Sequence, residues 1–306
     1  MKTLAADHKF YAFSAANPPA LTVDPGAELL IEAQDCFSNQ IQTEEEQFSL
    51  VDWDKVNPAT GPVFVNGAQP GDIVVASVLD IRPAEQGVMT AVPGLGALGH
   101  RITEAETRIV PIVGRHAIFS QSIKLPLAPM VGVIGTAPAR GAILNGTPGP
   151  HGGNMDCTLI AEGSIVYLPV EVPGALFGLG DLHAAMGDGE ILICGVEMAG
   201  WVRVRLDVVR GCDLPLPLVE NGELVATIHS HEDLDQAAQG AIESMARLLT
   251  EQVGLPVNEA GMLMSAAGQL RVCQVVDPLK TCRMEFPKWV LEKHGFSLKR
   301  LRGSMA

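Results

Sequence analysis

The sequence of 306 residues lacks three signals that would place it in familiar classes. Its six cysteines, at positions 36, 157, 194, 212, 273 and 282, form no C-x-x-C pair, which excludes the usual zinc-ribbon and redox motifs. The N-terminal stretch MKTLAADHKFYAF has no apolar segment of a secretory signal, and apolar runs such as IVVASVL are too short to cross a bilayer. We therefore expect a cytoplasmic protein with free thiols and no membrane partner.

Positive charge is also scarce, because the formal net charge is -14. Such an acidic chain would repel the phosphates of a nucleic acid, so we expect no nucleic-acid partner. The hydrophobic content of 47% is sufficient for a sizeable core, in one large domain or in two intimate ones.

Helical periodicity is rare before residue 230, where short apolar runs bounded by turn residues dominate. These runs predict strands. They are ELLIEAQD (28–35), GPVFVNG (61–67), DIVVASVLDI (72–81), RIVPIV (108–113), SIVYLPVEV (164–172), EILICGVEM (190–198), WVRVRLDVV (201–209) and ELVATIH (223–229). Polar and apolar residues alternate along 202–209, which predicts a strand with one solvent-facing side.

The C-terminal region has a different pattern. Residues 232–253 carry apolar side chains at helical spacing, with Ser230 as the expected N-cap and Gly254 as the stop. A second helix is predicted at 257–266, a strand at 269–277 and a last helix at 287–295. The fold class is therefore mainly β with an α+β part. We expect residues 1–220 to form a β-rich domain and 221–306 a smaller α+β portion, unless the two form one intimate unit.

The stretch TPGPHGGNMDC, residues 147–157, is rich in glycine and proline around one histidine and one aspartate. Its glycines permit positive φ and leave backbone N–H groups free to bind an anion or a developing oxyanion. His151 and Asp156 could supply a nitrogen and an oxygen ligand. The alternative is a tight loop whose histidine is hydrogen-bonded by the backbone.

A second polar stretch, residues 174–197, contains Asp181 and His183 two positions apart. On an extended backbone this spacing places both side chains on one face, as metal ligands on a strand often are. A turn at 187–190 would fold Glu190 or Glu197 back toward Asp181. Carboxylates rarely gather in apolar surroundings unless something positive joins them, so this stretch favours a metal site.

Asp35 ends an apolar strand and is a third candidate ligand, although a strand-end aspartate can also cap a turn. Cys157 follows Asp156 and could be a nucleophile, but the sequence identifies no partner base, and a buried inert thiol is the simpler interpretation. The H-x-H pair of residues 229 and 231 lies where a strand gives way to a helix, so we assign it no function.

Several segments resemble the acetamidase/formamidase family, in family order and over roughly residues 20–200. They are DCFSNQI, NPATGPVFVNGAQPGDIV, IGTAPA, TPGPHGGNMD, SIVYLPVEVPGALFGLGDLHAAMGDGE and GVE. The chain is more compact than the longer formamidases, and IHSHED does not look like a family motif. The resemblance implies sandwich-like or barrel-like β sheets with a C-terminal helical pair, and a homo-oligomer, a dimer being our first expectation.

The resemblance also implies a hydrolase that converts a small aliphatic amide to a carboxylate and ammonia, with a divalent metal in at least some members. We expect Asp35, His151, Asp181 and His183 to bind the metal. Zinc is the first choice, and calcium is possible at an oxygen site. Our candidates for proton transfer are Glu190, Asp156 and Glu197, and for substrate binding Gly152, Gly153 and Asn154.

Three alternatives stay open at this point. A metal-free amidase could use the Cys157 thiol, and a β-scaffold could bind a small ligand without catalysis. A 2-His-1-carboxylate set of His151, His183 and Asp181 would also suit an iron dioxygenase.

Overall fold

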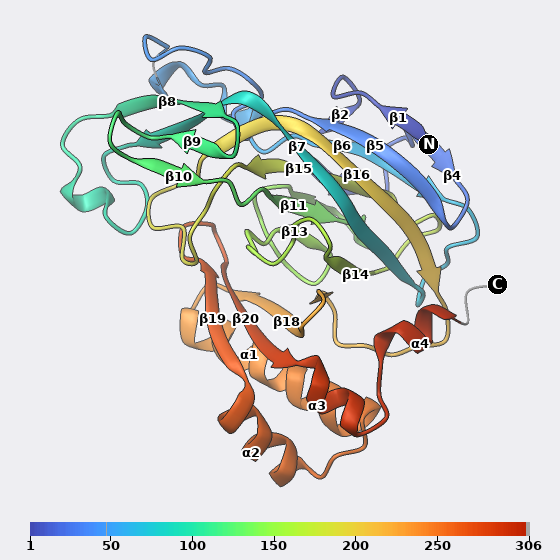
Figure 1. Ribbon diagram of the computed structural model, residues 1–306. Coiled ribbons are helices and arrows are strands. Elements are labelled where there is room, and N and C mark those ends of the chain that lie inside the picture. Colours follow the sequence, from blue (N-terminus) through green and yellow to red (C-terminus); the bar gives the residue numbers. More distant parts are fainter. Residues whose placement is uncertain (47, 304–306) are drawn as a thin grey trace.

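The computed structural model describes residues 1–46 and 48–303 and is mainly β (Figure 1). The strands of its larger, β-rich part are β1 (Lys2–Leu4), β2 (Lys9–Phe10), β3 (Ala12–Ser14), β4 (Leu21–Val23), β5 (Ala27–Ala33), β6 (Ala59–Val65), β7 (Ile73–Ala91), β8 (Glu106–Val113), β9 (His116–Ile118), β10 (Lys124–Pro126), β11 (Met130–Gly135), β12 (Ala142–Leu144), β13 (Gly152–Asn154), β14 (Ile165–Pro169), β15 (Phe177–His183), β16 (Glu197–Val209) and β17 (Leu218–Glu220). Short 3-10 helices cover Phe48–Leu50, Trp53–Lys55 and Gly99–Arg101.

Two long strands organise this part. β16 pairs antiparallel with β7 along most of its length, and its other edge pairs with β5. Its side chains alternate between buried and exposed or partly exposed from Met198 to Leu206. The predicted alternation over 202–209 therefore holds as far as Leu206, whereas Asp207, Val208 and Val209 are all buried. Apolar residues of these strands, such as Ile31, Val74 and Val202, are fully buried in the largest core cluster.

The C-terminal part comprises β18 (Leu224–His231), α1 (Leu234–Arg247), a π-helical turn (Leu248–Gln252), α2 (Val257–Ala267), β19 (Gln269–Gln274), β20 (Lys280–Pro287), α3 (Lys288–Lys293) and α4 (Leu298–Gly303). Figure 1 shows α1, α2 and α3 below the β-rich body, with α1 against β18 and β20. α1 buries Ala237, Ala241 and Met245 in a second core cluster. The predicted fold class is confirmed, including the C-terminal helical pair.

Two local predictions are wrong. The N-cap of α1 is Asp233, whose side chain accepts from the backbone N–H of Gln236, whereas Ser230 still belongs to β18. Residues 190–196, all within the described part of the chain, form an irregular loop with bends, and the strand begins only at Glu197. The apolar run there includes Cys194 and Val196, which are buried from a loop, so burial without a strand produced the misleading pattern.

The two parts share one continuous sheet of 18 strands, because β17 pairs with both β14 and β18. Within residues 1–46 and 48–303, no helix is both long and apolar enough to cross a membrane. The continuous sheet fixes the β19–β20 hairpin against the β-rich body, and this contact matters for the site described next.

Candidate active site

The site is centred on His183, the last residue of β15. β15 pairs with β16 so that His183 lies opposite Glu197, and the His183 Nε2 to Glu197 Oε1 distance is 2.7 Å. The backbone N–H of Gly195 also donates to Glu197 Oε1, at 2.8 Å. Strand pairing therefore brings Glu197 back to the D-x-H stretch, as the sequence predicts, although no tight hairpin is involved.

Two more carboxylates approach the same imidazole nitrogen. Asp156, in the loop after β13, places Oδ1 at 3.9 Å from His183 Nε2, and Glu190, from the turn at 187–190, places Oε1 at 3.8 Å. Ligand atoms of these three residues lie within 4.8 Å of one another, and so do those of Cys36, Asp181 and Glu197. Five of the predicted site residues thus form one buried cluster, and Cys36 lies beside it. The five are Asp156, Asp181, His183, Glu190 and Glu197.

The backbone at the site is unusual, because three of its acidic residues have positive φ. The φ values are 44° at Asp156, 53° at Asp181 and 42° at Glu190. Such conformations are uncommon outside glycine and are often found at functional sites. At Asp181 the positive φ interrupts the extended backbone of β15. The spacing predicts that an extended strand would place Asp181 and His183 on one face, and the backbone does not follow that simple alternation.

Gly132 of β11 leaves the space into which two of these carboxylates point. A Cβ atom on Gly132 would lie 2.5 Å from Asp156 Oδ1 and 2.7 Å from Asp181 Oδ2. The β11–β15 pairing joins Val131 to Leu182 and Val133 to Gly180, with a break between them opposite Asp181. Only a residue without a side chain fits here, so Gly132 is part of the site, although no feature of its sequence surroundings singles it out.

Several buried polar atoms of the site lack a hydrogen-bond partner in the described part of the chain. Among the described residues, no hydrogen bond reaches either oxygen of Asp156, Oδ1 of Asp181, Nδ1 of His183, or the Oε2 atoms of Glu190 and Glu197. Buried polar groups are normally hydrogen-bonded, and leaving several carboxylate oxygens unsatisfied is costly. Mixed oxygen and nitrogen donors in a dry site suit a divalent cation, so these residues fit a metal ion.

The electrostatics of the site follow from burial and from crowded negative charge. Burial raises the pKa of Asp156 well above its usual value, and Glu190, Asp277 and Asp181 add to this effect. Burial and Glu197 likewise raise the pKa of Asp181. Burial opposes protonation of His183, but the nearby carboxylates Glu197 and Asp181 outweigh it and raise the pKa of the imidazole. All three shifts favour the protonated forms of these groups, and a bound cation would favour the carboxylates instead.

Asp277 is a member of the site that sequence reasoning missed. It lies in the β19–β20 connection, more than 90 residues from the predicted motifs around Asp181 and His183. The residue is half-buried, but its Oδ2 atom is buried and has no hydrogen-bond partner among the described residues. Burial raises the pKa of Asp277, with further contributions from Glu190 and Asp181. The α+β part of the chain thus contributes directly to the acidic cluster.

Two predicted metal ligands, Asp35 and His151, lie outside both groups of converging ligand atoms. Asp35 Oδ1 accepts the backbone N–H groups of Phe37 and Asn39 at 3.0 and 2.8 Å, so this carboxylate caps its own loop. Burial nevertheless raises its pKa to about 6. His151 packs edge-on against Phe13, and burial lowers its pKa to about 4. Both of its ring nitrogens lack a partner in the described structure, so its role as a ligand stays a prediction.

The glycine-rich stretch has the backbone that its composition predicts at Gly152 and Gly153, whose φ values are 98° and 80°. The N–H of Gly152 donates to the carbonyl of Gly149 at 3.0 Å, so in this conformation it is not free to stabilise an oxyanion. Asn154 Oδ1 is buried without a hydrogen-bond partner in the described residues. Cys157, next to Asp156, is fully buried in the largest core cluster.

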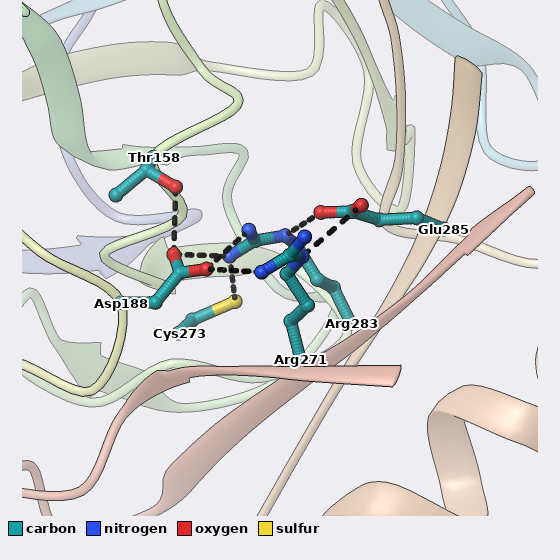
Figure 2. A network of polar contacts seen from close by, with 6 residues as sticks. All are labelled: Thr158, Asp188, Arg271, Cys273, Arg283 and Glu285. Carbon is teal, nitrogen blue, oxygen red and sulfur yellow. Dashed lines mark hydrogen bonds and ion pairs between the residues drawn. The ribbon is translucent and has the colours of Figure 1, made fainter. Parts of the chain in front are cut away.

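A second charged cluster fixes the turn that carries Glu190 (Figure 2). Arg283 of β20 donates through Nη1 and Nη2 to the two oxygens of Asp188, at 2.8 and 2.7 Å, and through Nε to Glu285 at 2.7 Å. Thr158 adds a hydrogen bond to Asp188 at 2.8 Å, and Gly189 N donates to the Cys273 carbonyl at 2.9 Å. The β19–β20 hairpin therefore positions Glu190 as well as supplying Asp277.

Fold and site together define a mainly β protein with a buried acidic centre suited to binding a cation. The model of the Acetamidase/Formamidase family matches residues 8–146 and 142–293. The chain therefore belongs to this family, which confirms the resemblance of its motifs.

Solved structures agree with this assignment. An acetamidase from Bacillus halodurans is 48% identical, covers 96% of this chain and 100% of its own, and superposes with a TM-score of 0.95. A protein of Thermoanaerobacter tengcongensis described as a predicted acetamidase/formamidase is also 48% identical, with a TM-score of 0.95 and coverage of 97% and 98%. An acetamidase of Mycolicibacterium smegmatis is 27% identical over 63% of this chain. The matches span 62–64% of the length of the curated relatives.

Proposed function

We propose that the protein is a metal-dependent amidase that hydrolyses a primary carboxamide to a carboxylate and ammonia. Its relatives carry the names acetamidase and formamidase, and these names support the reaction class. One structural observation carries the proposal: three buried carboxylates surround His183 Nε2, and each retains an oxygen without a hydrogen-bond partner among the described residues. A site of this kind is costly to maintain unless it binds something positive.

His183, Asp156 and Asp181 are the proposed metal ligands, and Glu197 lies beside them, with Oε1 2.7 Å from His183 Nε2. The presence of an imidazole favours zinc or a similar transition metal, whereas calcium prefers oxygen ligands alone. A divalent metal bound here would lower the pKa of a water ligand and polarise the amide carbonyl.

Glu190 is the proposed proton carrier. Among the three carboxylates that approach His183 Nε2 it is the most exposed, although only to 7%. Its carboxylate can accept a proton from the attacking water and deliver it to the amide nitrogen as the C–N bond breaks. Ammonia leaves poorly unless it is protonated, so this transfer is the step that the chain itself must provide.

A thiol nucleophile is less well supported. Cys157 is fully buried in an apolar cluster. Cys36 adjoins the acidic site, but burial and the charges of Glu197 and Asp181 raise the pKa of its thiol well above the usual value. A thiol with a raised pKa is a poor nucleophile at neutral pH.

Ammonia release from protein of known metal content tests the proposal. We expect Glu190→Gln to lower the rate by about 10²–10⁴-fold while the metal stays bound. Glu162→Gln, the same chemical change at an exposed site, serves as the matched control and should leave the rate unchanged.

The other possible results of this experiment would each contradict one part of the proposal. Wild-type rates in Glu190→Gln with metal bound would move the proton transfer to another carboxylate, Glu197 first. Ammonia release that survives chelation would indicate a side-chain nucleophile. Saturable amide binding without ammonia release would indicate a ligand-binding scaffold.

The expected homo-oligomer stays a prediction.

A further inference from the structure

A large apolar cavity adjoins the acidic site. Its volume is about 590 Å³, and its apolar lining includes Phe37, Phe48, Trp53, Val56, Leu95 and Ile193. The three rings form a chain of edge-to-face contacts, with centroids 5.9 Å apart for Phe37 and Phe48 and 5.1 Å for Phe48 and Trp53. We refer to this cavity as the aromatic chamber.

The aromatic chamber lies next to the site, because two of its lining residues adjoin the acidic cluster. Cys36 lines the chamber, and its sulfur lies within 4.8 Å of ligand atoms of Asp181 and Glu197. Asp277 also lines the chamber, and the charges of Glu190 and Asp181 contribute to the raised pKa of its carboxyl group. A molecule in the chamber would therefore face the reacting centre with one end.

The volume of the chamber is far greater than a one- or two-carbon amide requires. Formamide has three non-hydrogen atoms and fills on the order of 60 Å³, about the volume of two water molecules. Pockets of several hundred Å³ lined by apolar and aromatic groups are typical of sites that enclose larger ligands. An aromatic lining with edge-to-face geometry suits an alkyl chain or a ring.

Charge restricts the ligand further. The carboxyl group of Asp277 in the chamber lining, together with a net charge of -14, disfavours a substrate with its own carboxylate. The Asn57 side chain offers a neutral polar group in the same lining. The inner end thus suits a neutral carboxamide, and the outer part suits its apolar tail.

We propose that the preferred substrate class is a neutral primary carboxamide with an apolar acyl group of roughly five to eight carbons, bound with its tail in the aromatic chamber. The inference rests on the proposed amidase function. The oxygen of water bonds to the acyl carbon, the C–N bond breaks, and both water protons end on nitrogen, so that R–CO–NH₂ and H₂O give R–COO⁻ and NH₄⁺. Contact between the tail and the chamber lowers the barrier by remote binding.

A substrate series tests the proposal with the metal-loaded protein. We expect kcat/KM to rise at least about tenfold from acetamide to hexanamide and phenylacetamide, since one methylene in an apolar pocket is worth about tenfold or more. Trp53→Ala and Phe48→Ala should lower kcat/KM for the longer amides about tenfold and leave acetamide within about twofold. Trp53 is 51% exposed, so its removal should not endanger folding.

Trp289→Ala is the matched control, because Trp289 is 61% exposed in α3 and is not among the residues that line the aromatic chamber. This substitution should leave kcat/KM unchanged for both acetamide and hexanamide. The proposal is overturned if acetamide is the best substrate, or if Trp53→Ala affects acetamide and hexanamide equally.

Failure of the amidase function would look different, since no amide would then release ammonia. In that case calorimetric binding of hexanamide decides the inference. Binding that Trp53→Ala weakens and Trp289→Ala does not would support an apolar-tail site, and an absence of binding would overturn it.

Discussion

Asp188 and Glu190 are two positions apart on one turn, yet they belong to charge clusters of opposite kinds: the Asp188 side chain is 30% exposed and paired with the buried Arg283, whereas Glu190 is buried. Burial alone would raise the pKa of Asp188, but its hydrogen bonds with Arg283 lower it below the usual value. Within the described part of the chain, no arginine or lysine forms an ion pair with Glu190, and the pKa of the neighbouring Asp156 is raised by burial and by acidic groups. The chain supplies a cation to the first cluster, whereas the second has only the imidazole of His183.

This difference separates a structural cluster from a functional one. A buried ion pair fixes geometry, and its removal is costly mainly because the remaining partner is left unpaired. A buried cluster of carboxylates with too little positive charge lowers the stability of the ligand-free protein. Binding of a cation can offset this loss. The paired cluster, formed by Asp188, Arg283 and Glu285, holds the turn in place. The unpaired cluster is the group of carboxylates around His183, and it can then bind a ligand.

Breaking the paired cluster should have the largest effect on folding. Arg283 has a side chain only 3% exposed, and Arg283→Met would leave Asp188 and Glu285 without their main partner. We expect a loss of about 3–5 kcal/mol in the free energy of unfolding, measured by urea titration.

Arg271→Met is the control for this experiment. Arg271 lies 3.9 Å from Asp188 and 3.4 Å from Glu285, but its side chain is 49% exposed. Its loss should cost less than about 1 kcal/mol. The double change Asp188→Asn with Arg283→Met should recover part of the stability, because one orphaned charge is removed. Equal losses for Arg283→Met and Arg271→Met would contradict the distinction between the clusters.

Adding a methyl group to the unpaired cluster disturbs its shape without changing any charge. Gly132→Ala would place Cβ 2.5 Å from an oxygen of Asp156 and 2.7 Å from one of Asp181, and both side chains would have to move. We expect a loss of about 1–3 kcal/mol in stability from overpacking, together with weaker metal binding. Thermal unfolding and calorimetric metal titration measure the two effects.

Gly222→Ala is the matched control, because a Cβ atom at this position would have nothing within 4 Å and its φ is not in the left-handed region. Its stability should change by less than about 0.5 kcal/mol. If Gly132→Ala bound metal as tightly as the wild type, Asp156 and Asp181 would not both be ligands.

The sequence predicted what is local and missed what depends on register. Apolar runs bounded by turn residues predicted β5, β7 and β16, and helical spacing predicted α1. The motif residues Asp156, Asp181, His183, Glu190 and Glu197 were found because each stands in an unusual local composition. Asp277, Cys36 and Gly132 stand in ordinary surroundings, and only the tertiary fold brings them to the site.

Arg283 illustrates the same limit. It lies 95 residues from Asp188 in a mostly buried strand, where an arginine without its partner gives no indication of a role. Asp35 shows the converse case. Its position after a strand suits a ligand or a loop cap equally well. The hydrogen bonds from Phe37 and Asn39 to Oδ1 show the cap, and its role as a ligand stays a prediction.

The smallest expected effect tests whether the unpaired cluster destabilises the metal-free protein. Asp156→Asn removes one negative charge, and asparagine tolerates the φ of 44° at this position. The folded-state pKa of Asp156 is raised, so its contribution to stability is fully present below the unfolded value of about 3.9 and is lost as the pH rises through the folded pKa. With chelator present, the variant and the wild type should therefore be nearly equal at pH 4.

At pH 8 the chelated variant should be more stable by about 0.5–2 kcal/mol. Adding metal should reverse the order, because the wild type then gains binding energy that the variant lacks. Asp7→Asn, at an exposed aspartate, should show neither effect. Asp156→Asn could instead be less stable than the wild type at pH 8 in chelator. The Asp156 carboxylate would then have a stabilising partner in the protein, and the distinction between the two clusters would be wrong.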